Sequence, residues 1–214
     1  DPIKVTIENI AAGHVEWLDA VNNPEDPSAG TRKIALTRTV YIERDDFREE
    51  APKKYFRLAP GKEVRLRYAY CITCKEVKKD AEGRVVELVC TYDPQTGHGQ
   101  TPDGRKVKGI LHWVSAEQCV DVPVRLYDHL FAVEHPDDVP EGVDWKTNLN
   151  PQSLVVTSAK VEASLQAAAA GTHWQFERVG YFYVDPKDSR PQAPVFLRTT
   201  TLKDTWAKLE KRED

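Results

Sequence analysis

The sequence predicts an all-β protein built of β-barrels, with a few short helices. Apolar residues gather in short runs rich in β-branched and aromatic side chains, and clusters of Gly, Pro, Asn or Asp bound these runs. Helix signals are confined to two short segments. Many short strands at irregular spacing, without an internal repeat, favour barrels over a repeat array.

The predicted strands follow from these runs. In chain order they are residues 5–7, 34–42, 64–77, 85–92, 106–114, 122–131, 154–156, 174–184 and 195–200. The tetrapeptide Asp80-Ala81-Glu82-Gly83 separates two runs and is expected to close a β-hairpin. Residues 94–104 are interpreted as a long mobile connection.

Two short helices are predicted. Asp46 and Glu49 have the spacing of a capping box, and Pro52 would stop the helix that follows. Residues 164–170 begin with a Ser cap, contain four consecutive alanines and precede Gly171, a typical helix terminator.

The length allows one domain or two small ones, because 214 residues exceed the usual domain size of roughly 100 to 150. The net charge of −4 and pI near 5.9 exclude broad polyanion binding and leave room for a local basic site.

The chain lacks Met and begins with Asp-Pro, so we expect a piece of a longer protein. No apolar run approaches the ~20 residues that span a bilayer, and no signal-peptide pattern opens the chain. We therefore expect a cytoplasmic protein without a membrane partner.

A basic and aromatic segment at residues 53–68 stands out from the acidic whole. Between Lys53 and Arg84 there are ten Lys or Arg and four acids, a net charge of +6. Unpaired bases stack on aromatic or guanidinium planes and phosphates attract cations, so this mixture is typical of a single-stranded RNA site.

Arg65 and Arg67 are predicted to share one face of a regular strand, with Val64, Leu66 and Tyr68 on the other. Two guanidinium groups so placed could follow successive phosphates of an extended RNA strand. The alternative is an ordinary solvated face with surface ion pairs, worth ~0 to 1 kcal/mol each.

The cysteines and histidines do not predict a metal site. Cys71 and Cys74 form a lone C-x-x-C within a strand run, where they would point to opposite faces. If the hairpin pairs about residues 81 and 82, Cys90 falls opposite Thr73 and near Cys71. Free thiols are therefore expected, and the histidines show neither metal-ligand spacing nor a nucleophile partner.

Seven short stretches, in order over the whole chain, carry a resemblance to a known family. They are residues 46–51 (DFREEA), 61–67 (GKEVRLR), 104–115 (GRKVKGILHWVS), 125–128 (RLYD), 175–178 (QFER), 180–182 (GYF) and 204–208 (DTWAK). The chain resembles the C-terminal anticodon-binding region of the bacterial glutaminyl-tRNA synthetases, which belong to the Glu/Gln subclass of class I.

The resemblance implies two β-barrels that splay and bind the anticodon loop of a tRNA for glutamine, whose anticodon has a central U and a final G. It implies a first barrel region at residues 1–116 and a second at residues 117–214. The boundary stays open, since the chain can return to the first barrel after building the second. The HIGH-type and KMSKS-type signatures of ATP handling are missing from the sequence. The piece is therefore expected to be a monomer that binds tRNA without catalysis and without a cofactor. ATP and Mg would belong to the catalytic domain of the parent glutamine-tRNA ligase.

The resemblance also implies the RNA-binding residues. They are Arg57, Arg65, Arg67, Gln175, Glu177 and Arg178, with the Pro24-Glu25 turn near the loop. Arg can pair with guanine or clamp a phosphate, and Gln can both donate to and accept from a splayed pyrimidine. Glu177 can orient Arg178 or accept from a base amine.

Two features depart from the simplest form of this site. Lys54 and Phe56 stand where the family often has Gln and Lys, and Phe56 is either a base-stacking or a core aromatic. Gln175 and Arg178 are three residues apart and would face opposite sides of a regular strand, so the strand must end or bulge between them.

Alternative functions stay open from the sequence. They are the equivalent region of a glutamyl-tRNA synthetase, a ribosomal-RNA-binding β-barrel protein and a β-barrel that mediates protein contacts.

Overall fold

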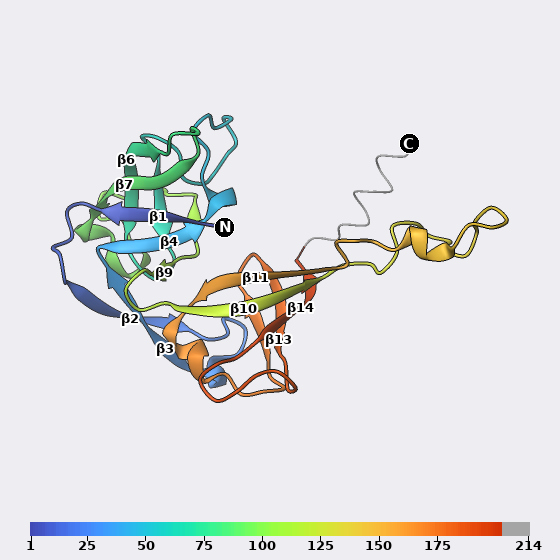
Figure 1. Ribbon diagram of the computed structural model, residues 1–214. Coiled ribbons are helices and arrows are strands. Elements are labelled where there is room, and N and C mark those ends of the chain that lie inside the picture. The colour runs from blue at the N-terminus through green and yellow to red at the C-terminus, as the bar shows by residue number, and fades with distance from the viewer. Residues whose placement is uncertain (203–214) are drawn as a thin grey trace. The chain divides into compact units, whose positions relative to one another are not determined.

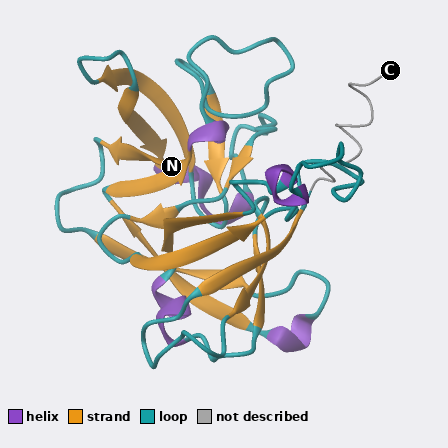
Figure 2. Ribbon diagram, turned by 45° about the vertical axis from the view of Figure 1, so that its right-hand side comes forward, coloured by secondary structure: helices purple, strands orange, loops and turns teal. Residues whose placement is uncertain are grey.

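The computed structural model describes residues 1–202, and strands dominate them. The helices among these residues are short 3-10 turns, drawn purple in Figure 2. The all-β prediction is confirmed. The stretch at residues 204–208, one of those that carry the family resemblance, lies outside the described residues.

The chain forms two compact units. The first contains Asp1–Val120 together with Lys160–Ser164, and the second contains Asp121–Ala159 and the chain from Leu165 onward. The short segment Lys160–Ser164 thus belongs to the first unit although both of its flanks belong to the second.

A seven-stranded sheet builds the first unit, and its strands are paired in the order β8-β5-β6-β7-β1-β4-β9. Figure 1 labels β6, β7, β1, β4 and β9 of this sheet. Their bounds are β1 (Pro2–Ile7), β4 (Thr39–Glu43), β5 (Glu63–Leu66), β6 (Cys71–Lys79), β7 (Val85–Asp93), β8 (Ile110–Leu111) and β9 (Val114–Ser115). Ile3, Val5 and Ile7 alternate into the core, as expected for a strand with one buried face.

A two-stranded ribbon, β2 (Val15–Val21) and β3 (Thr31–Thr37), also belongs to the first unit. The two strands are antiparallel, with Val15 opposite Thr37 and Val21 opposite Thr31. The tip between them is exposed and contains the 3-10 turn η1 (Pro27–Ala29), whose first turn is capped by the Asp26 carboxylate. The sequence did not predict β2, in which the adjacent apolar residues Trp17 and Leu18 interrupt the alternation of apolar and polar side chains.

A five-stranded sheet, in the order β11-β10-β14-β13-β12, lies mostly in the second unit. Its strands are β10 (Val120–Tyr127), β11 (Leu154–Val161), β12 (His173–Phe176), β13 (Gly180–Val184) and β14 (Phe196–Thr201). Phe176 stacks on the buried Phe182 at a centroid distance of 4.1 Å. A long excursion with the 3-10 turn η4 (Trp145–Asn148) joins β10 to β11 (Figure 1).

Neither predicted helix forms as an α-helix. Near residue 46 there is only the 3-10 turn η2 (Arg44–Asp46), and Phe47 is extended at φ −123 and ψ 137. Phe47 is buried and bridges to Leu58, so tertiary packing overrides the capping-box signal. The alanine segment forms the short 3-10 turn η5 (Ala163–Ala167).

Several predicted strands are interrupted. Residues 34–42 split into β3 and β4, and residues 106–114 contribute only the short β8 and β9. Residues 64–77 split into β5 and β6 around a turn in which the Ala69 amide donates to the Leu66 carbonyl at 2.9 Å. Tyr68 has φ 63 in this turn, a conformation that no Gly or Asn signals in advance.

The hairpin at residues 80–83 is confirmed, but its register differs by one residue from the prediction. The Asp80 amide donates to the Arg84 carbonyl at 2.9 Å, and Gly83 has φ 82. Cys90 consequently lies opposite Cys74 and not opposite Thr73. The connection that follows β7 contains the 3-10 turn η3 (Pro94–Gly99), within which Thr96 is buried.

Candidate nucleic-acid interface

A pocket of about 340 Å³ lies in the first unit, between the segment that precedes β5 and the segment that precedes β8. Its walls are Lys53, Tyr55, Phe56, Arg57, Lys62, Glu63, Val64, Arg105, Lys106, Val107, Lys108 and Gly109. Six of these residues are Lys or Arg and one is acidic. A concave surface with this excess of cations attracts a polyanion even though the whole chain is acidic.

Phe56 lies at the surface of this pocket. Its side chain is 52 % exposed, so the alternative in which it is a core aromatic is wrong. The Nζ of Lys108 stands 5.1 Å from the centroid of its ring. Lys54, two residues earlier, is exposed as well. An accessible ring beside an ammonium group can offer a base its flat face and a phosphate its counterion.

Gly109 allows the two walls of the pocket to approach closely. A Cβ at this position would lie 2.6 Å from the Phe56 carbonyl oxygen. The Gly109 carbonyl accepts from the Arg65 amide at 2.8 Å. The glycine therefore holds the Lys106–Lys108 segment against β5 and beside Phe56.

Arg57 is oriented by an ion pair with the buried carboxylate of Asp46. The Leu58 amide also donates to the Asp46 carbonyl, at 3.0 Å. A guanidinium has five N–H donors, so this pair fixes its direction and leaves donors for a phosphate or a guanine edge.

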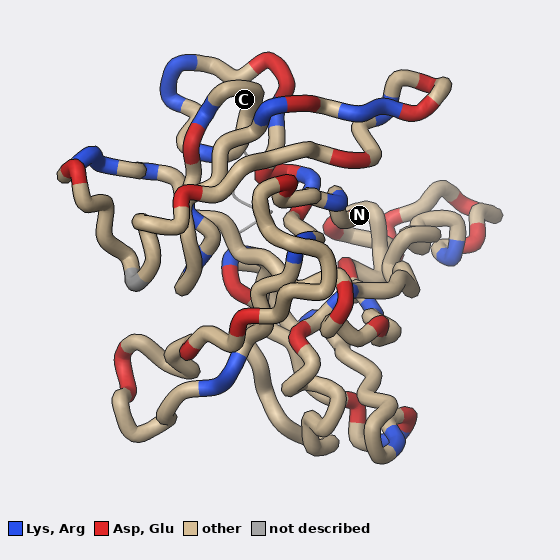
Figure 3. Tube along the Cα trace, turned by 90° about the vertical axis from the view of Figure 1, so that its left-hand side faces the viewer, with Lys and Arg blue, Asp and Glu red and all other residues tan. Residues whose placement is uncertain are grey.

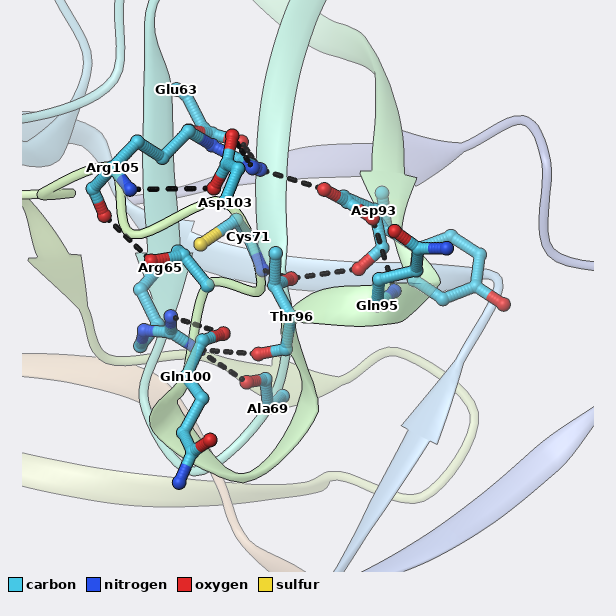
Figure 4. A network of polar contacts seen from close by, with 12 residues as sticks. Glu63, Arg65, Ala69, Cys71, Asp93, Gln95, Thr96, Gln100, Asp103 and Arg105 are labelled. Carbon is cyan, nitrogen blue, oxygen red and sulfur yellow. Dashed lines mark hydrogen bonds and ion pairs between the residues drawn. The ribbon is translucent and has the colours of Figure 1, made fainter.

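Arg65 does not lie on an open basic face, contrary to the prediction. It is only 9 % exposed. Its Nη1 donates to the carbonyls of Thr96 at 2.6 Å and Ala69 at 3.3 Å, and its Nη2 donates to Gln100 at 3.3 Å (Figure 4). Because β5 ends at Leu66, the turn after it and the connection after β7 close over this side chain.

Arg67 lies in the turn between β5 and β6, beside the ribbon. Its guanidinium carbon stands 5.0 Å from the centroid of the Tyr68 ring, and the Tyr68 hydroxyl donates to the Val21 carbonyl at 3.3 Å. Val21 is the last residue of β2 and precedes the exposed Pro24-Glu25 turn by three positions. The structure thus brings Tyr68, whose ring Arg67 covers, to the end of β2.

Arg105 is a residue of the pocket that sequence reasoning missed. Its guanidinium donates to Glu63 at 2.8 and 2.9 Å, to Asp93 at 2.6 Å and to Asp103 at 2.8 Å (Figure 4). Hydrogen bonds from Arg105 hold the pKa values of Asp93 and Asp103 below their usual range. Through Glu63 and Asp93, Arg105 links the segment that carries Lys106 and Lys108 to β5 and β7. These partners are distant in sequence, so no local sequence pattern predicts the contacts.

Gln175, Glu177 and Arg178 lie at the β12–β13 hairpin of the second unit. β12 ends at Phe176, which pairs with Gly180, and the Val179 amide donates to the Phe176 carbonyl at 2.9 Å. Arg178 has φ 66 in this turn. The strand therefore ends between Gln175 and Arg178. Strand alternation then no longer forces these two side chains to opposite faces, as it would if both lay on one regular strand.

The cysteines of the first unit are thiols, and Cys71, Cys74 and Cys90 are buried. Burial raises the pKa of Cys71, which makes its thiolate less available. Within residues 1–202 no three Cys, His, Asp or Glu residues gather as metal ligands would.

Lys and Arg (blue) and Asp and Glu (red) are both scattered along a trace that consists mostly of other residues (Figure 3). The strong local excess of cations at the pocket is therefore a departure from its surroundings. Among the described residues, no helix has the length and apolar character needed to cross a bilayer.

Two family models match the sequence, at residues 1–93 and at residues 110–185, and both are described as the anti-codon binding domain of class I tRNA synthetases (E and Q). The chain belongs to this family. The first match includes the pocket residues from Lys53 to Val64, and the second includes Gln175 to Arg178. Arg105, Lys106 and Lys108 lie between the two matched ranges.

Curated relatives of the chain are named glutamine–tRNA ligase. The protein from Nitrobacter hamburgensis is 55 % identical over 97 % of this chain and 36 % of its own length. The protein from Rhodopirellula baltica is 51 % identical over 99 % of this chain and 35 % of its own length, and that from Vibrio parahaemolyticus is 51 % identical over 99 % and 38 %. The chain thus spans little more than a third of these relatives, and the family resemblance seen in the sequence is confirmed.

Proposed function

We propose that this chain binds the anticodon loop of a tRNA that accepts glutamine. The observation that carries the proposal is the pocket of the first unit, where six cationic residues surround an exposed Phe56. A splayed loop needs both an aromatic platform for bases and cations for phosphates. The family match and the relatives named glutamine–tRNA ligase support tRNA as the ligand and glutamine as the amino acid.

In the proposed complex, Arg57 contacts a base edge or phosphate, Phe56 stacks on a base, and Lys54 contributes charge at the pocket. Arg67 and the Pro24-Glu25 turn form a second contact region at the ribbon. Gln175, Glu177 and Arg178 read a base from the second unit. Arg65 contributes mainly by bracing the turn after β5 and the connection after β7, because its donors are directed to backbone carbonyls there.

We further propose that residues 1–116 and 117–214 act as the two anticodon-binding regions of a parent enzyme that joins glutamine to its tRNA with ATP and Mg. In this proposal the chain supplies recognition as a monomer in the cytoplasm and takes no part in the chemical step.

A mobility-shift titration tests this function. The chain is titrated against tRNA of glutamine specificity, against the same tRNA with a changed central anticodon base, and against a ribosomal RNA fragment of similar length. We expect the unaltered tRNA to bind most tightly, with each lost base contact costing ~1 to 3 kcal/mol. Equal affinity for all three RNAs would contradict anticodon recognition, and absence of RNA binding would favour a protein partner.

A further inference from the structure

The β12–β13 hairpin has one apolar core face and one outer face rich in aromatic side chains. The register places Trp174 opposite Phe182 and Gln175 opposite Tyr181. Because side chains alternate along a strand, Phe176 and the buried Phe182 lie on the core face. The outer face then carries His173, Gln175, Tyr181 and Tyr183.

Tyr181 is the more accessible of the two tyrosines on this face. It is 45 % exposed, whereas Tyr183 is half-buried and packs against His173 at a centroid distance of 4.7 Å. Directly opposed residues of an antiparallel pair have Cβ atoms ~4.5 to 5.5 Å apart, so the ring of Tyr181 and the amide of Gln175 are immediate neighbours.

The backbone at Tyr181 is irregular and held in place. Tyr181 pairs with Thr200 but Phe182 pairs with Arg198, so Thr199 is an extra residue on β14. The Thr199 hydroxyl donates to the Tyr181 carbonyl at 3.1 Å. Gly180 lies so close to the backbone of β14 that a Cβ at this position would be 2.5 Å from the Thr200 carbonyl oxygen. A β-bulge re-aims the neighbouring side chain, and bulges are frequent beside binding sites.

We propose that Tyr181 stacks on an unpaired RNA base and that Gln175 reads the edge of that base. This inference rests on the proposed function, in which Gln175 contacts the anticodon loop. The bulge and the Thr199 hydrogen bond hold the backbone at Tyr181, and the ring is exposed at the surface. Tyr loses little conformational freedom on stacking because only two torsions orient its side chain. Stacking contributes binding free energy for every type of base, because each base has a flat π face. The Gln175 amide, with one acceptor and two donors, would distinguish one base from another by hydrogen bonding to its edge.

Three variants of the same position test the proposal on the full 214-residue chain. Tyr181→Phe keeps the aromatic ring, Tyr181→Leu keeps apolar bulk without a π face, and Tyr181→Ala removes both. Tyr127→Ala is the matched control, since Tyr127 is 48 % exposed on β10. The probe is tRNA of glutamine specificity, and affinity is measured by fluorescence anisotropy at several salt concentrations.

We expect Tyr181→Leu and Tyr181→Ala to weaken binding about 5- to 150-fold, the range that follows from the usual stacking energy per base. Tyr181→Phe and Tyr127→Ala should bind like the parent chain. The salt dependence should keep its slope in all Tyr181 variants, because no phosphate contact is removed. Thermal melting of each variant reports whether the fold is intact, and the Leu and Phe pair decides the question if the Ala variant unfolds.

Two results overturn the inference while leaving the proposed function intact. In the first, the parent chain binds its tRNA selectively and Tyr181→Leu binds equally well. In the second, Tyr181→Phe loses as much affinity as Tyr181→Leu, which would assign the effect to the hydroxyl and not to the ring. A parent chain that binds no RNA would instead defeat the proposed function itself.

Discussion

At the scale of single residues, the arginines of the basic segment have different roles that their sequence does not distinguish. Arg57 is held at a pocket wall by Asp46, Arg65 is enclosed by backbone carbonyls, and Arg67 lies over Tyr68 in a turn. The surroundings of Arg65 and Arg67 differ because the chain turns between them. Because β5 ends at Leu66, the alternation that would place Arg65 and Arg67 on one solvated face is lost.

Replacing Arg65 with Met is expected to destabilise the fold by about 1 to 3 kcal/mol, because buried carbonyls lose their donor. The change keeps most of the side-chain volume, so the missing hydrogen bonds dominate. Urea unfolding of the variant measures the loss. A variant of unchanged stability that binds tRNA poorly would show that Arg65 contacts RNA directly.

Replacing Phe56 with Ala should weaken tRNA binding with little loss of stability, the opposite of what is expected for Arg65. The ring is half exposed, so stability should change little, while affinity for tRNA should fall by ~1 to 3 kcal/mol if a base stacks there. Phe56→Tyr is the matched control, since it retains a flat ring. Binding titrations and thermal melts on the same samples separate the two quantities, and equal affinity of all three proteins would rule out stacking.

At the scale of elements, the sequence predicts those turns and strands whose conformation depends on neighbouring residues in the chain. The β6–β7 hairpin was predictable because Asp80 and Gly83 are strong turn formers. The turn at Arg67 and Tyr68 and the extended Phe47 were not, since burial and strand pairing override weak local preference. For the site, Arg57 and the Gln175–Arg178 segment came from the family resemblance. The pocket wall at Arg105 depends on Glu63 and Asp93, which only the folded chain brings near.

Gly109→Ala tests whether the element that carries Lys106 and Lys108 must lie close to Phe56. The added Cβ meets the Phe56 carbonyl, so the segment should shift and overpacking should cost about 1 to 3 kcal/mol. Weaker tRNA binding should accompany this loss, as measured by urea unfolding and anisotropy. Ile110→Ala is the control, because Ile110 directly follows Gly109, is 46 % exposed and is not one of the pocket walls, so this variant should bind tRNA normally.

At the scale of the whole molecule, the path of the chain determines which unit each proposed RNA-binding residue belongs to. The residues proposed to read RNA are divided between two compact units, with Arg57 in the first and Gln175 in the second. Lys160–Ser164 belongs to the first unit, and within it Glu162 accepts from Arg32 on β3 at 2.8 Å. His112 lies 3.7 Å from the same carboxylate. This ion-pair group fixes the returning segment within the first unit.

Stability of the first unit should therefore depend on pH through Glu162. Burial alone would raise its pKa, but hydrogen bonds from Arg32 and then His112 outweigh burial and lower the pKa from 4.5 to about 2. A carboxyl whose pKa is depressed by folding stabilises the protein above its unfolded pKa. That contribution is lost as the pH falls from near 4.5 through 2. The shift corresponds to about 3 kcal/mol at neutral pH.

Glu162→Gln removes the charge with little change of shape. We expect it to lower the free energy of unfolding at pH 7. The difference from the parent chain should shrink as the pH falls from near 4.5 toward 2, because Glu162 is then increasingly protonated, first in the unfolded and then in the folded chain. Urea unfolding at a series of pH values measures this convergence. Glu117→Gln is the control, since Glu117 is exposed and should give parallel curves. A constant difference at every pH would mean that the glutamine disturbs packing, and that the carboxylate charge does not secure the returning segment.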